Sequence, residues 1–370
     1  MKFSKSLQAC FKKTFQFFFK LLYGEIKLKV NLDELKNLYK KKILNIKSDI
    51  DGVKDYYTYK ILNGRVYTDY VENVAIISQN YLVDKISYQQ VSGDLKDASQ
   101  NIVLHNGTPR FKKKYRGKVL TVLQGASGAN YSHWTLEMLP KIKLYSEHYS
   151  LEDLNYIYMP KIDIFHKESL SVLGINENKL IDSEKFRHIQ ADELFVVDHP
   201  YYYHGTILEQ NKNLPKWIIE WLRKTYLSYE KKFNANKRVF IDRSDSKYKH
   251  NQLNNKEEVF DYLKKNNFTT YKLEELSFFE KIYLFKNADI ILGIHGAGFT
   301  NLAFCKPKTK FIEIRPYSYS NTVYERISNI NDLNYNLIQT ENLEDNKKNN
   351  GDINLSVKNL NITLENIFKN

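Results

Sequence analysis

Residues 290–301 combine an apolar run, three glycines and several side chains that can form hydrogen bonds. The apolar residues 290–292 predict a strand buried on both faces, and residues 299–304 predict the start of a helix. Glycine permits a positive φ and lets a ligand approach the backbone, while the free N–H groups at a helix start attract an anion. The segment therefore predicts a phosphate-binding loop at the carboxyl end of a strand, where open α/β sheets bind ligands. The residues expected to bind are Gly293, His295, Gly296, Ala297, Gly298, Thr300 and Asn301.

A second group of residues that could carry chemistry lies at 130–140, after a glycine-containing segment at 125–130. His133 and Glu137 are four residues apart, so on a helix they share one face. A carboxylate can orient an imidazole that removes a proton from a hydroxyl, which makes this pair a candidate catalytic base. The alternative is a histidine at a helix start beside a surface glutamate, with Asn130 and Ser132 as ordinary helix caps.

Arg243 follows a predicted strand at 238–242. Its guanidinium could clamp two phosphate oxygens, and a solvated surface arginine is an equally good interpretation. The loop at 293–301 also has an alternative interpretation, a tight turn that binds no ligand. The histidine inside this loop and the polar residues after it favour the binding site.

The sequence lacks the spacing of a metal site. His133, His250 and His295 lie far apart along the chain, whereas metal sites commonly include ligands at short spacing. The segment 242–245 is not the close pair of carboxylates that holds a divalent ion on a diphosphate. A G-x-S-x-G nucleophile elbow and a Walker A loop are absent from the sequence as well. We therefore expect no metal and no cofactor.

The chain has 370 residues and a formal net charge of +13, and this length accommodates two domains. Residues 1–42 hold eleven lysines and three acidic residues, so most of the charge lies at the amino end. A nucleic-acid partner is therefore not expected. Cys10 and Cys305 are too few for a disulfide scaffold, which favours a reducing compartment.

Residues 3–23 predict a helix with two different faces, one apolar and one rich in lysine. This composition is typical of a helix that lies in an anionic membrane surface, and a helix packed on the body of the protein is the alternative. Lysines at 12, 13 and 20 interrupt the apolar run, so neither a membrane span nor a signal peptide is expected. We predict a cytoplasmic protein, peripheral on the inner face of the cell membrane. The apolar face would contain Leu7, Cys10, Phe11, Phe15, Phe18, Phe19 and Leu22.

The remaining chain predicts an α/β protein. Residues 31–46 predict a second polar helix or a linker, and short runs at 66–67, 74–77 and 81–83 predict an antiparallel, β-rich subregion. From residue 118 onwards, predicted strands and helices alternate as in parallel, doubly wound sheets. The expected parts are a membrane-associating helix and linker at 1–45, an α/β domain at 46–215, a second α/β domain at 216–340, and a polar loop with a last helix at 341–370.

These segments together resemble glycosyltransferase family 61. The resemblance spans residues 60–330 and rests on residues 130–140, Arg243, residues 276–280, and the loop at 293–301 followed by Glu313, in this order. It implies a GT-B-like pair of Rossmann-type domains and an inverting transfer of a sugar from a nucleotide-sugar donor. Bacterial members are associated with capsular and other surface polysaccharides, which implies a glycan or lipid-linked acceptor.

The resemblance also implies roles for single residues and an active site in the cleft between the domains. The donor side would contain the loop residues, Arg243 and Glu313; the acceptor side would contain the catalytic pair His133 and Glu137, with Asn130, Tyr131 and Trp134. The chain departs from the family pattern where residues 247–251 contain no arginine and where Lys281 stands in place of a glutamine. These departures support one alternative, a non-catalytic, membrane-attached protein that binds a nucleotide sugar or a polyanion.

Overall fold

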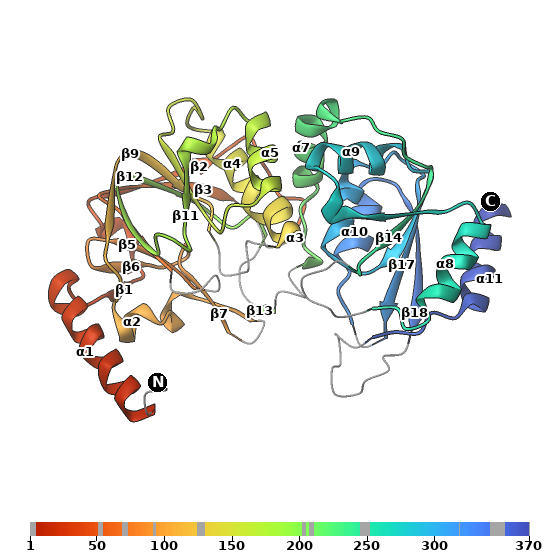
Figure 1. Cartoon of the computed structure of the whole chain (residues 1–370). Coiled ribbons are helices and arrows are strands. Elements are labelled where there is room, and N and C mark those ends of the chain that lie inside the picture. The colour runs from red at the N-terminus through yellow and green to blue at the C-terminus, as the bar shows by residue number, and fades with distance from the viewer. Residues whose placement is uncertain are drawn as a thin grey trace. The chain divides into compact units, whose positions relative to one another are not determined.

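The computed structural model describes residues 5–50, 55–68, 73–91, 94–123, 130–201, 205–206, 211–244, 252–317, 319–340 and 352–369. The chain forms two compact units, Met1–Pro215 and Lys216–Asn370, and each is described by itself (Figure 1). Among the described helices, none combines the length and the apolar composition that crossing a membrane requires.

The first unit is built on one mixed sheet, to which thirteen of the described strands belong. Its main path is β11-β10-β9-β12-β4-β5-β7-β8-β13, with β1 and β6 paired beside β5, and β2 and β3 paired beside β12. The strands are β1 (Lys27–Lys29), β2 (Leu38–Ile43), β3 (Tyr56–Leu62), β4 (Arg65–Tyr67), β5 (Asn73–Ser78), β6 (Tyr81–Val83), β7 (Tyr88–Val91), β8 (Asp94–Lys96), β9 (Lys113–Thr121), β10 (Tyr156–Met159), β11 (Leu180–Asp182), β12 (His188–Val197) and β13 (Gly205–Thr206).

Among the described strands, β9 to β12 form the part of this sheet with the parallel pairing of a Rossmann-type domain, and the short strands β1 and β6 also pair in parallel. β9 pairs in parallel with β10 and β12, and β10 pairs in parallel with β11. The strands from β3 to β8 pair mainly antiparallel, because connections of a few residues are too short for a parallel crossover. The antiparallel part is thus much larger than the predicted subregion, and the first unit is not a simple Rossmann-type domain.

Strand β12 lies in the middle of the sheet, and the sequence analysis did not predict it. It pairs with β9, β3 and β4. Its register against β9 shifts between Ala191 and Glu193, and such a bulge interrupts the alternation of apolar and polar residues. With Asp192 and Glu193 at the irregularity, the segment does not have the pattern of a buried strand.

Residues 31–46 differ from the predicted polar helix or linker. They contain a short 3-10 turn, η1 (Leu32–Glu34), and strand β2, which pairs antiparallel with β3. Leu35 and Ile43 are buried, while the lysines at 40–42 between them are exposed. Because β3 is the only described strand that pairs with β2, these lysines lie on an edge strand, where charged side chains are common.

The helical segments of the first unit are mostly short. They are α1 (Lys5–Tyr23), α2 (Val103–Asn106), α3 (Tyr131–His133), the π-helix η3 (Trp134–Met138), α4 (Leu139–Ser146), α5 (Ile164–Val172) and the 3-10 turns η2 (Ala98–Gln100) and η4 (Glu177–Lys179). α3, η3 and α4 follow one another without a break, and every residue of η3 is buried. Pro140 lies just after the π-turn. A proline clashes with the carbonyl four residues earlier in a regular helix, and the wider turn relieves that clash.

The second unit contains the parallel sheet predicted for the C-terminal half. Its strand order is β15-β14-β16-β17-β18, and all four pairings are parallel. The strands are β14 (Arg238–Asp242), β15 (Thr269–Lys272), β16 (Ile290–Ile294), β17 (Lys310–Pro316) and β18 (Asn334–Thr340). β16 is buried along its whole length, as its apolar sequence predicts.

Helices cover both faces of this sheet (Figure 1). The helical segments are α7 (Lys216–Tyr226), η5 (Leu227–Tyr229), α8 (Lys256–Lys265), η6 (Leu273–Glu275), α9 (Phe278–Asn287), η7 (Ala297–Phe304), α10 (Val323–Ile330) and α11 (Val357–Lys369). Apolar residues of α8 and α11 share one buried cluster with one face of the sheet, including Val259, Leu360 and Leu292. The last helix is therefore part of this core.

Candidate functional site

The second unit has a topological switch point between β14 and β16. From β14 the chain passes through α8 to β15 on one side, and from β16 it continues to β17 and β18 on the other side. Open α/β sheets bind ligands outside the carboxyl ends of the strands at such a point. Arg243 directly follows β14, and His295 and Gly296 directly follow β16. The residues predicted to bind an anion therefore lie at this switch point.

The loop glycines are required by close packing and not by a left-handed backbone. None of Gly293, Gly296 and Gly298 has a φ in the left-handed region, so a need for such a backbone does not explain these glycines. A Cβ on Gly293 would lie 3.0 Å from the backbone oxygen of Ile241, and one on Gly298 would lie 2.4 Å from Cδ1 of Leu273. Glycine thus allows the loop to pack against the neighbouring strand and turn.

Gly296 has a different neighbour, the guanidinium of Arg243. A Cβ on Gly296 would lie 2.6 Å from Nε and 2.7 Å from Cζ of Arg243. Nη1 of Arg243 also donates a hydrogen bond to the backbone oxygen of His295. Residues 296–298 are partly exposed, and the first N–H groups of η7 have no carbonyl three residues earlier within that helix. A side-chain cation and backbone donors therefore meet at one accessible loop.

His295 lies behind this loop in a hydrogen-bonded group. Its Nδ1 bonds to Oε1 of Glu313 on β17, and the Tyr335 hydroxyl donates to Oε2 of the same carboxylate at 2.7 Å. The rings of Tyr319 and Tyr324 lie 4.6 and 4.8 Å from the imidazole, between ring centroids. Burial lowers the pKa of His295; Glu313 opposes this shift, and the nearby arginines add to it. A neutral imidazole is therefore favoured, with its Nδ1–H held by Glu313.

Arg315 is a second arginine of this group, and sequence analysis did not identify it. It lies two residues after Glu313 on β17, so both side chains point to the same side of the strand. Arg315 is buried, its Nη1 donates to the backbone oxygen of Asn321, and within the described part of the chain its Nε has no hydrogen-bond partner. The sequence signal that could have identified Arg315 is its position at the carboxyl end of the strand that follows the glycine loop.

Thr300 and Asn301, both predicted to bind the ligand, are buried inside η7. The Thr300 hydroxyl donates to the Ala297 oxygen at 2.8 Å, and the Asn301 side-chain amide donates to the Gly298 oxygen at 2.8 Å. These bonds fix the turn that carries the loop. The structure therefore gives both side chains a supporting role.

The second predicted group lies in the first unit, at the start of the segment α3–η3–α4. Residues 124–129, which precede it, lie outside the described residues. The Asn130 side chain caps α3 by accepting a hydrogen bond from the Ser132 N–H at 2.8 Å, which agrees with the simple capping interpretation. This cap fixes where the helix begins and hence the direction in which His133 points.

His133 and Glu137 form a hydrogen-bonded pair. Nδ1 of His133 lies 2.6 Å from Oε1 of Glu137, and the side chains are 22% and 3% exposed. Glu137 is thus enclosed, while part of the imidazole reaches solvent. Burial acts to lower the pKa of His133, but the carboxylate of Glu137 raises it above its ordinary value. Since Nδ1–H donates to the carboxylate, the lone pair of the neutral ring lies on Nε2.

Glu137 is held by residues that the sequence did not identify. The Tyr201 hydroxyl donates to Oε1 at 3.1 Å, and Nε2 of His199 lies 3.8 Å from Oε2. Both follow β12, whose carboxyl end lies beside that of β9 in the parallel part of the sheet. Burial acts to raise the pKa of Glu137, yet His133 and His199 lower it to about 2. The carboxylate therefore stays ionised at all physiological pH values.

Lys141 adds a buried amine one helical turn after Glu137. Its Nζ donates to the Leu123 backbone oxygen at 2.7 Å, and burial lowers its pKa to about 7 although Glu137 and Asp198 oppose this shift. The spacing of four residues was visible in the sequence. What the sequence did not show was that the lysine faces inwards.

The remaining predicted residues of this group have different environments. Trp134 is fully buried, and its indole N–H donates to the Ser169 hydroxyl at 2.9 Å. Its surroundings are those of a core residue that anchors the helix. Tyr131 is partly exposed, and its ring packs edge-on against Phe165 with 5.2 Å between centroids.

Within the described ranges, no group of three or more histidine, cysteine, aspartate or glutamate side chains could hold a metal ion. Residues 245–251, which include the positions where a further arginine was sought, lie outside the described residues. Lys281 lies on α9 and is almost fully buried.

Comparison with known proteins identifies one family. Residues 131–312 match the family model described as Glycosyltransferase 61. The matched region begins at α3, contains His133 and Glu137, and ends on β17 one residue before Glu313. A search of the curated proteins gives no match.

Proposed function

We propose that the chain, which belongs to glycosyltransferase family 61 and is a glycosyltransferase, is an inverting enzyme that uses a nucleotide-sugar donor. The proposed acceptor is a glycan or lipid-linked oligosaccharide of a surface polysaccharide such as a capsule. The observation that carries the proposal is the pair His133–Glu137 in one unit together with an arginine-lined glycine loop in the other. The first would serve the acceptor and the second the donor, in a GT-B-like enzyme.

The donor side is proposed on charge and accessibility. A departing nucleoside diphosphate carries negative charge, which cations and backbone N–H groups stabilise. Arg243 lies over Gly296 at the partly exposed loop, and Arg315 is within electrostatic range of His295. Glu313 holds the Nδ1–H of His295, so on the donor side this imidazole would position the loop. It is not proposed as the base, because the base must lie on the acceptor side, where the hydroxyl loses its proton.

The acceptor side is proposed on the geometry of the imidazole. In a single displacement, the acceptor oxygen bonds to the anomeric carbon as the bond from that carbon to the diphosphate oxygen breaks. The diphosphate leaves with the bonding electrons, and the hydroxyl proton moves to Nε2 of His133. The enclosed Glu137 orients the ring and stabilises the imidazolium that forms, as the carboxylate of a catalytic triad does. Glu137 is thus a positioning residue and His133 the proposed base.

A donor screen tests this function. The full-length protein is incubated with individual UDP-, GDP-, CMP- and dTDP-sugars, and release of the nucleotide and formation of product are measured. The expected result is slow hydrolysis of one donor class, faster turnover with acceptor and inversion at the anomeric carbon. Tight nucleotide-sugar binding without hydrolysis or transfer under any condition would favour the non-catalytic binder instead.

Activity is expected to persist in EDTA. The grounds are that the chain offers Arg243, Arg315 and the start of η7 as positive partners of the diphosphate, whereas its sequence lacks a close pair of carboxylates at 242–245. The initial rate would be measured in excess EDTA, then with Mg²⁺ or Mn²⁺ restored. A complete loss in EDTA that either ion reverses would contradict this prediction.

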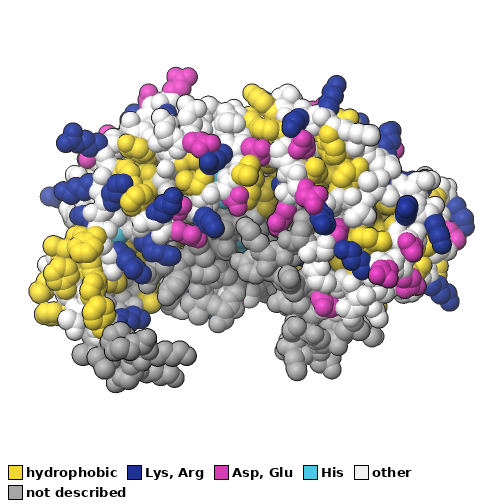
Figure 2. Space-filling model, viewed as in Figure 1, with side chains coloured by type: hydrophobic (Ala, Val, Ile, Leu, Met, Phe, Trp, Pro, Cys, Tyr) yellow, Lys and Arg dark blue, Asp and Glu magenta, His cyan; other side chains and the backbone are white. Residues whose placement is uncertain are grey.

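Membrane attachment through α1 is proposed on the exposure of its apolar side chains. Phe17 and Leu21 are 64% and 72% exposed, and Phe11, Phe15 and Phe18 are exposed as well. They form the large hydrophobic area over α1 in Figure 2. Among residues 11–22 of the predicted apolar face, whose side chains the structure describes, only Phe19 is buried, against Phe111 and Tyr23. A solvent-exposed aromatic area of this kind commonly marks an interaction surface, and neighbouring lysines suit an anionic membrane.

Deleting residues 1–24 is therefore expected to move the protein from the membrane fraction to the soluble fraction. High salt should release the full-length protein only in part, because salt screens the lysines but not the burial of phenylalanine. Co-sedimentation with anionic vesicles measures both effects, and donor hydrolysis by the truncated protein serves as the control. A full-length protein that ignores anionic vesicles would rule out this attachment and, with it, the proposed place on the cytoplasmic face of the membrane.

A further inference from the structure

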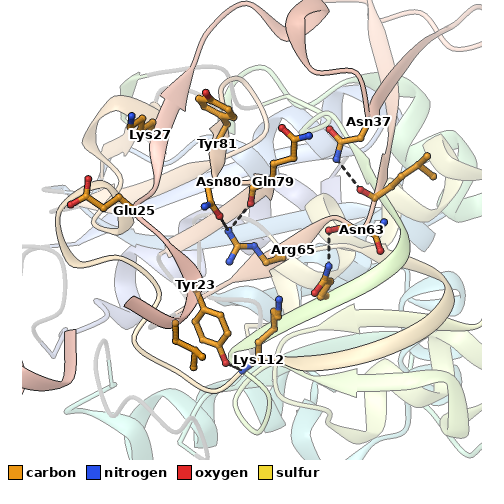
Figure 3. Close-up of a pocket in the computed structure, with 13 residues that line it drawn as sticks. Tyr23, Glu25, Lys27, Asn37, Asn63, Arg65, Gln79, Asn80, Tyr81 and Lys112 are labelled. Atoms are coloured by element: carbon orange, nitrogen blue, oxygen red, sulfur yellow. Dashed lines mark hydrogen bonds between the residues drawn. The ribbon is translucent and has the colours of Figure 1, made fainter. Parts of the chain in front are cut away.

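A pocket of about 920 Å³ lies in the first unit at the end of α1 (Figure 3). The last two residues of that helix, Leu22 and Tyr23, line it together with Arg65 of β4 and Lys112, which directly precedes β9. None of the residues assigned to sugar transfer lines this pocket. It therefore requires an explanation of its own.

Arg65 contributes a buried positive charge to the pocket. The residue is only 4% exposed, and its Nη2 donates to the Gln79 backbone oxygen at 2.7 Å and to Oδ1 of Asn80 at 2.8 Å. Both acceptors are neutral, and among the residues that the structure describes no carboxylate forms an ion pair with this guanidinium. Burial lowers the pKa of Arg65 to about 10. A buried cation is costly without a counter-charge, so the site favours an anion.

Lys112 places a second cation close to the first. Its backbone N–H donates to the Tyr23 hydroxyl at 3.0 Å, and its amine lies 5.3 Å from the centroid of the Tyr23 ring. Burial lowers the pKa of Lys112, and the charges of Arg65 and Lys114 lower it further, so the two pocket cations repel each other. Lys27 also lines the pocket, and among the described lining residues the only carboxylate is that of the exposed Glu25.

Two cations that line one pocket suit a phosphate group. A guanidinium can donate two hydrogen bonds to phosphate oxygens, and an ammonium can add a third from another direction. Figure 3 shows the Arg65 and Lys112 side chains entering the same pocket, with Tyr23 beside them. Since Tyr23 is the last residue of α1, whatever binds here binds at the end of the helix that exposes its phenylalanines.

We propose that this pocket binds the phosphate of an anionic phospholipid headgroup, held by Arg65 and Lys112, and so fixes the first unit to the membrane on which α1 lies. The proposal rests on the proposed membrane attachment and is independent of the transfer reaction. The shared chemistry is a phosphate ester, which a soluble metabolite could also supply. The α1 surface favours the lipid, because a headgroup and the phenylalanines would then engage the same membrane.

Vesicle binding tests the proposal with full-length protein. Neutral glycolipid vesicles are made anionic with either phosphatidylglycerol or oleate and are matched in zeta potential, so that only one set presents a charged phosphate. Wild type is expected to bind the phosphatidylglycerol vesicles at least about fivefold more tightly, the effect of about one well-placed charge contact. Lys112→Gln should remove this preference. Lys113→Gln is the matched control, because the Lys113 amine lies over the Phe186 ring, 3.8 Å from its centroid, and not in the pocket lining.

Arg65→Gln is a second variant, with thermal melting to establish that it folds; if it does not fold, Lys112→Gln decides. The proposal is overturned if wild type shows no preference, if Lys112→Gln keeps the preference, or if Lys113→Gln loses it equally. It is also overturned if inorganic phosphate or glycerol phosphate binds the vesicle-free protein tightly at this pocket and abolishes vesicle selectivity at low concentration, since the pocket would then serve a soluble ligand. Donor binding, measured separately, should be the same in all variants, so failure of the transferase proposal would be distinguishable.

Discussion

Gly296→Val is expected to abolish binding of the nucleotide-sugar donor in a protein that still folds. The φ of Gly296 is 177°, an extended conformation that valine adopts without strain. The added Cβ, however, would lie 2.6 Å from Nε of Arg243, so the guanidinium must leave the loop. The remaining methyl groups would occupy the space in front of the first N–H groups of η7. Calorimetric titration with the donor or with the free nucleoside diphosphate measures the loss, and circular dichroism establishes the fold.

Smaller substitutions separate two causes of the loss: displacement of the Arg243 guanidinium and blocking of the first N–H groups of η7. Gly296→Ala should act mainly by displacing Arg243 and should weaken donor binding roughly tenfold to a hundredfold, the size of a lost charged hydrogen bond. Arg243→Ala should cost about as much, and the double variant little more than either, because both changes remove one interaction. Gly298→Ala is the matched control, since its Cβ would meet the Leu273 side chain, 2.4 Å from Cδ1 and 3.6 Å from Cγ, and not Arg243. The end of the leucine side chain can move. Additive losses for Gly296→Ala and Arg243→Ala would contradict the proposed role of Arg243.

The position of the glycine loop at 293–298 could be predicted because local sequence determines it. An apolar β-branched run before glycines predicts a buried strand that ends in a tight loop, and β16 and η7 follow in that order. The helix type and the reason for the glycines could not be predicted. Both depend on what packs against the loop, namely Ile241, Leu273 and the Arg243 guanidinium, which come from other parts of the chain.

The histidine–glutamate pair was predictable for a similar reason. A spacing of four residues places both side chains on one helical face, and His133 and Glu137 are hydrogen-bonded in the structure. The burial of Glu137 was not predictable, because Tyr201 and His199 reach it from the end of β12. The bulge in β12 interrupts the alternating pattern that would have predicted a strand there. The contacts of Tyr201 and His199 with Glu137 could therefore not be predicted either. Long-range pairing in the mixed sheet, unlike helical spacing, leaves little trace in a single sequence.

The sequence pattern of α1 was only partly informative about packing. The helical periodicity of residues 3–23 placed Phe18 and Phe19 on one face. In the structure, however, Phe19 is buried against the body of the first unit, while Phe18 is half exposed. A helix that touches the protein along one line and exposes apolar residues on either side has three kinds of surface. Helical periodicity separates apolar from charged residues and so distinguishes only two of these surfaces.

His133→Ala is expected to lower the turnover number by roughly a hundredfold or more, the usual size of a general-base contribution, while donor affinity stays unchanged. The wild-type rate should also depend on pH in a defined direction. The base must be neutral to accept a proton, and the Glu137 carboxylate raises the pKa of His133. The rate should therefore fall as the pH is lowered through a value above the ordinary 6.5 of histidine. Single-turnover rates from pH 5 to 9, with donor affinity measured in parallel, would show this.

Glu137→Gln provides the sharper test, because it keeps the imidazole and removes only the charge behind it. The rate should fall less than in His133→Ala, since the amide oxygen can still accept the hydrogen bond from Nδ1. Burial would then act on His133 without its opposing carboxylate, so the pKa of the imidazole should drop and the acid limb of the pH profile should move to lower pH. A merely structural role for Glu137 would lower the rate at every pH without this shift. If the glutamine variant were inactive and the alanine variant at position 133 nearly normal, Glu137 and not His133 would be the base.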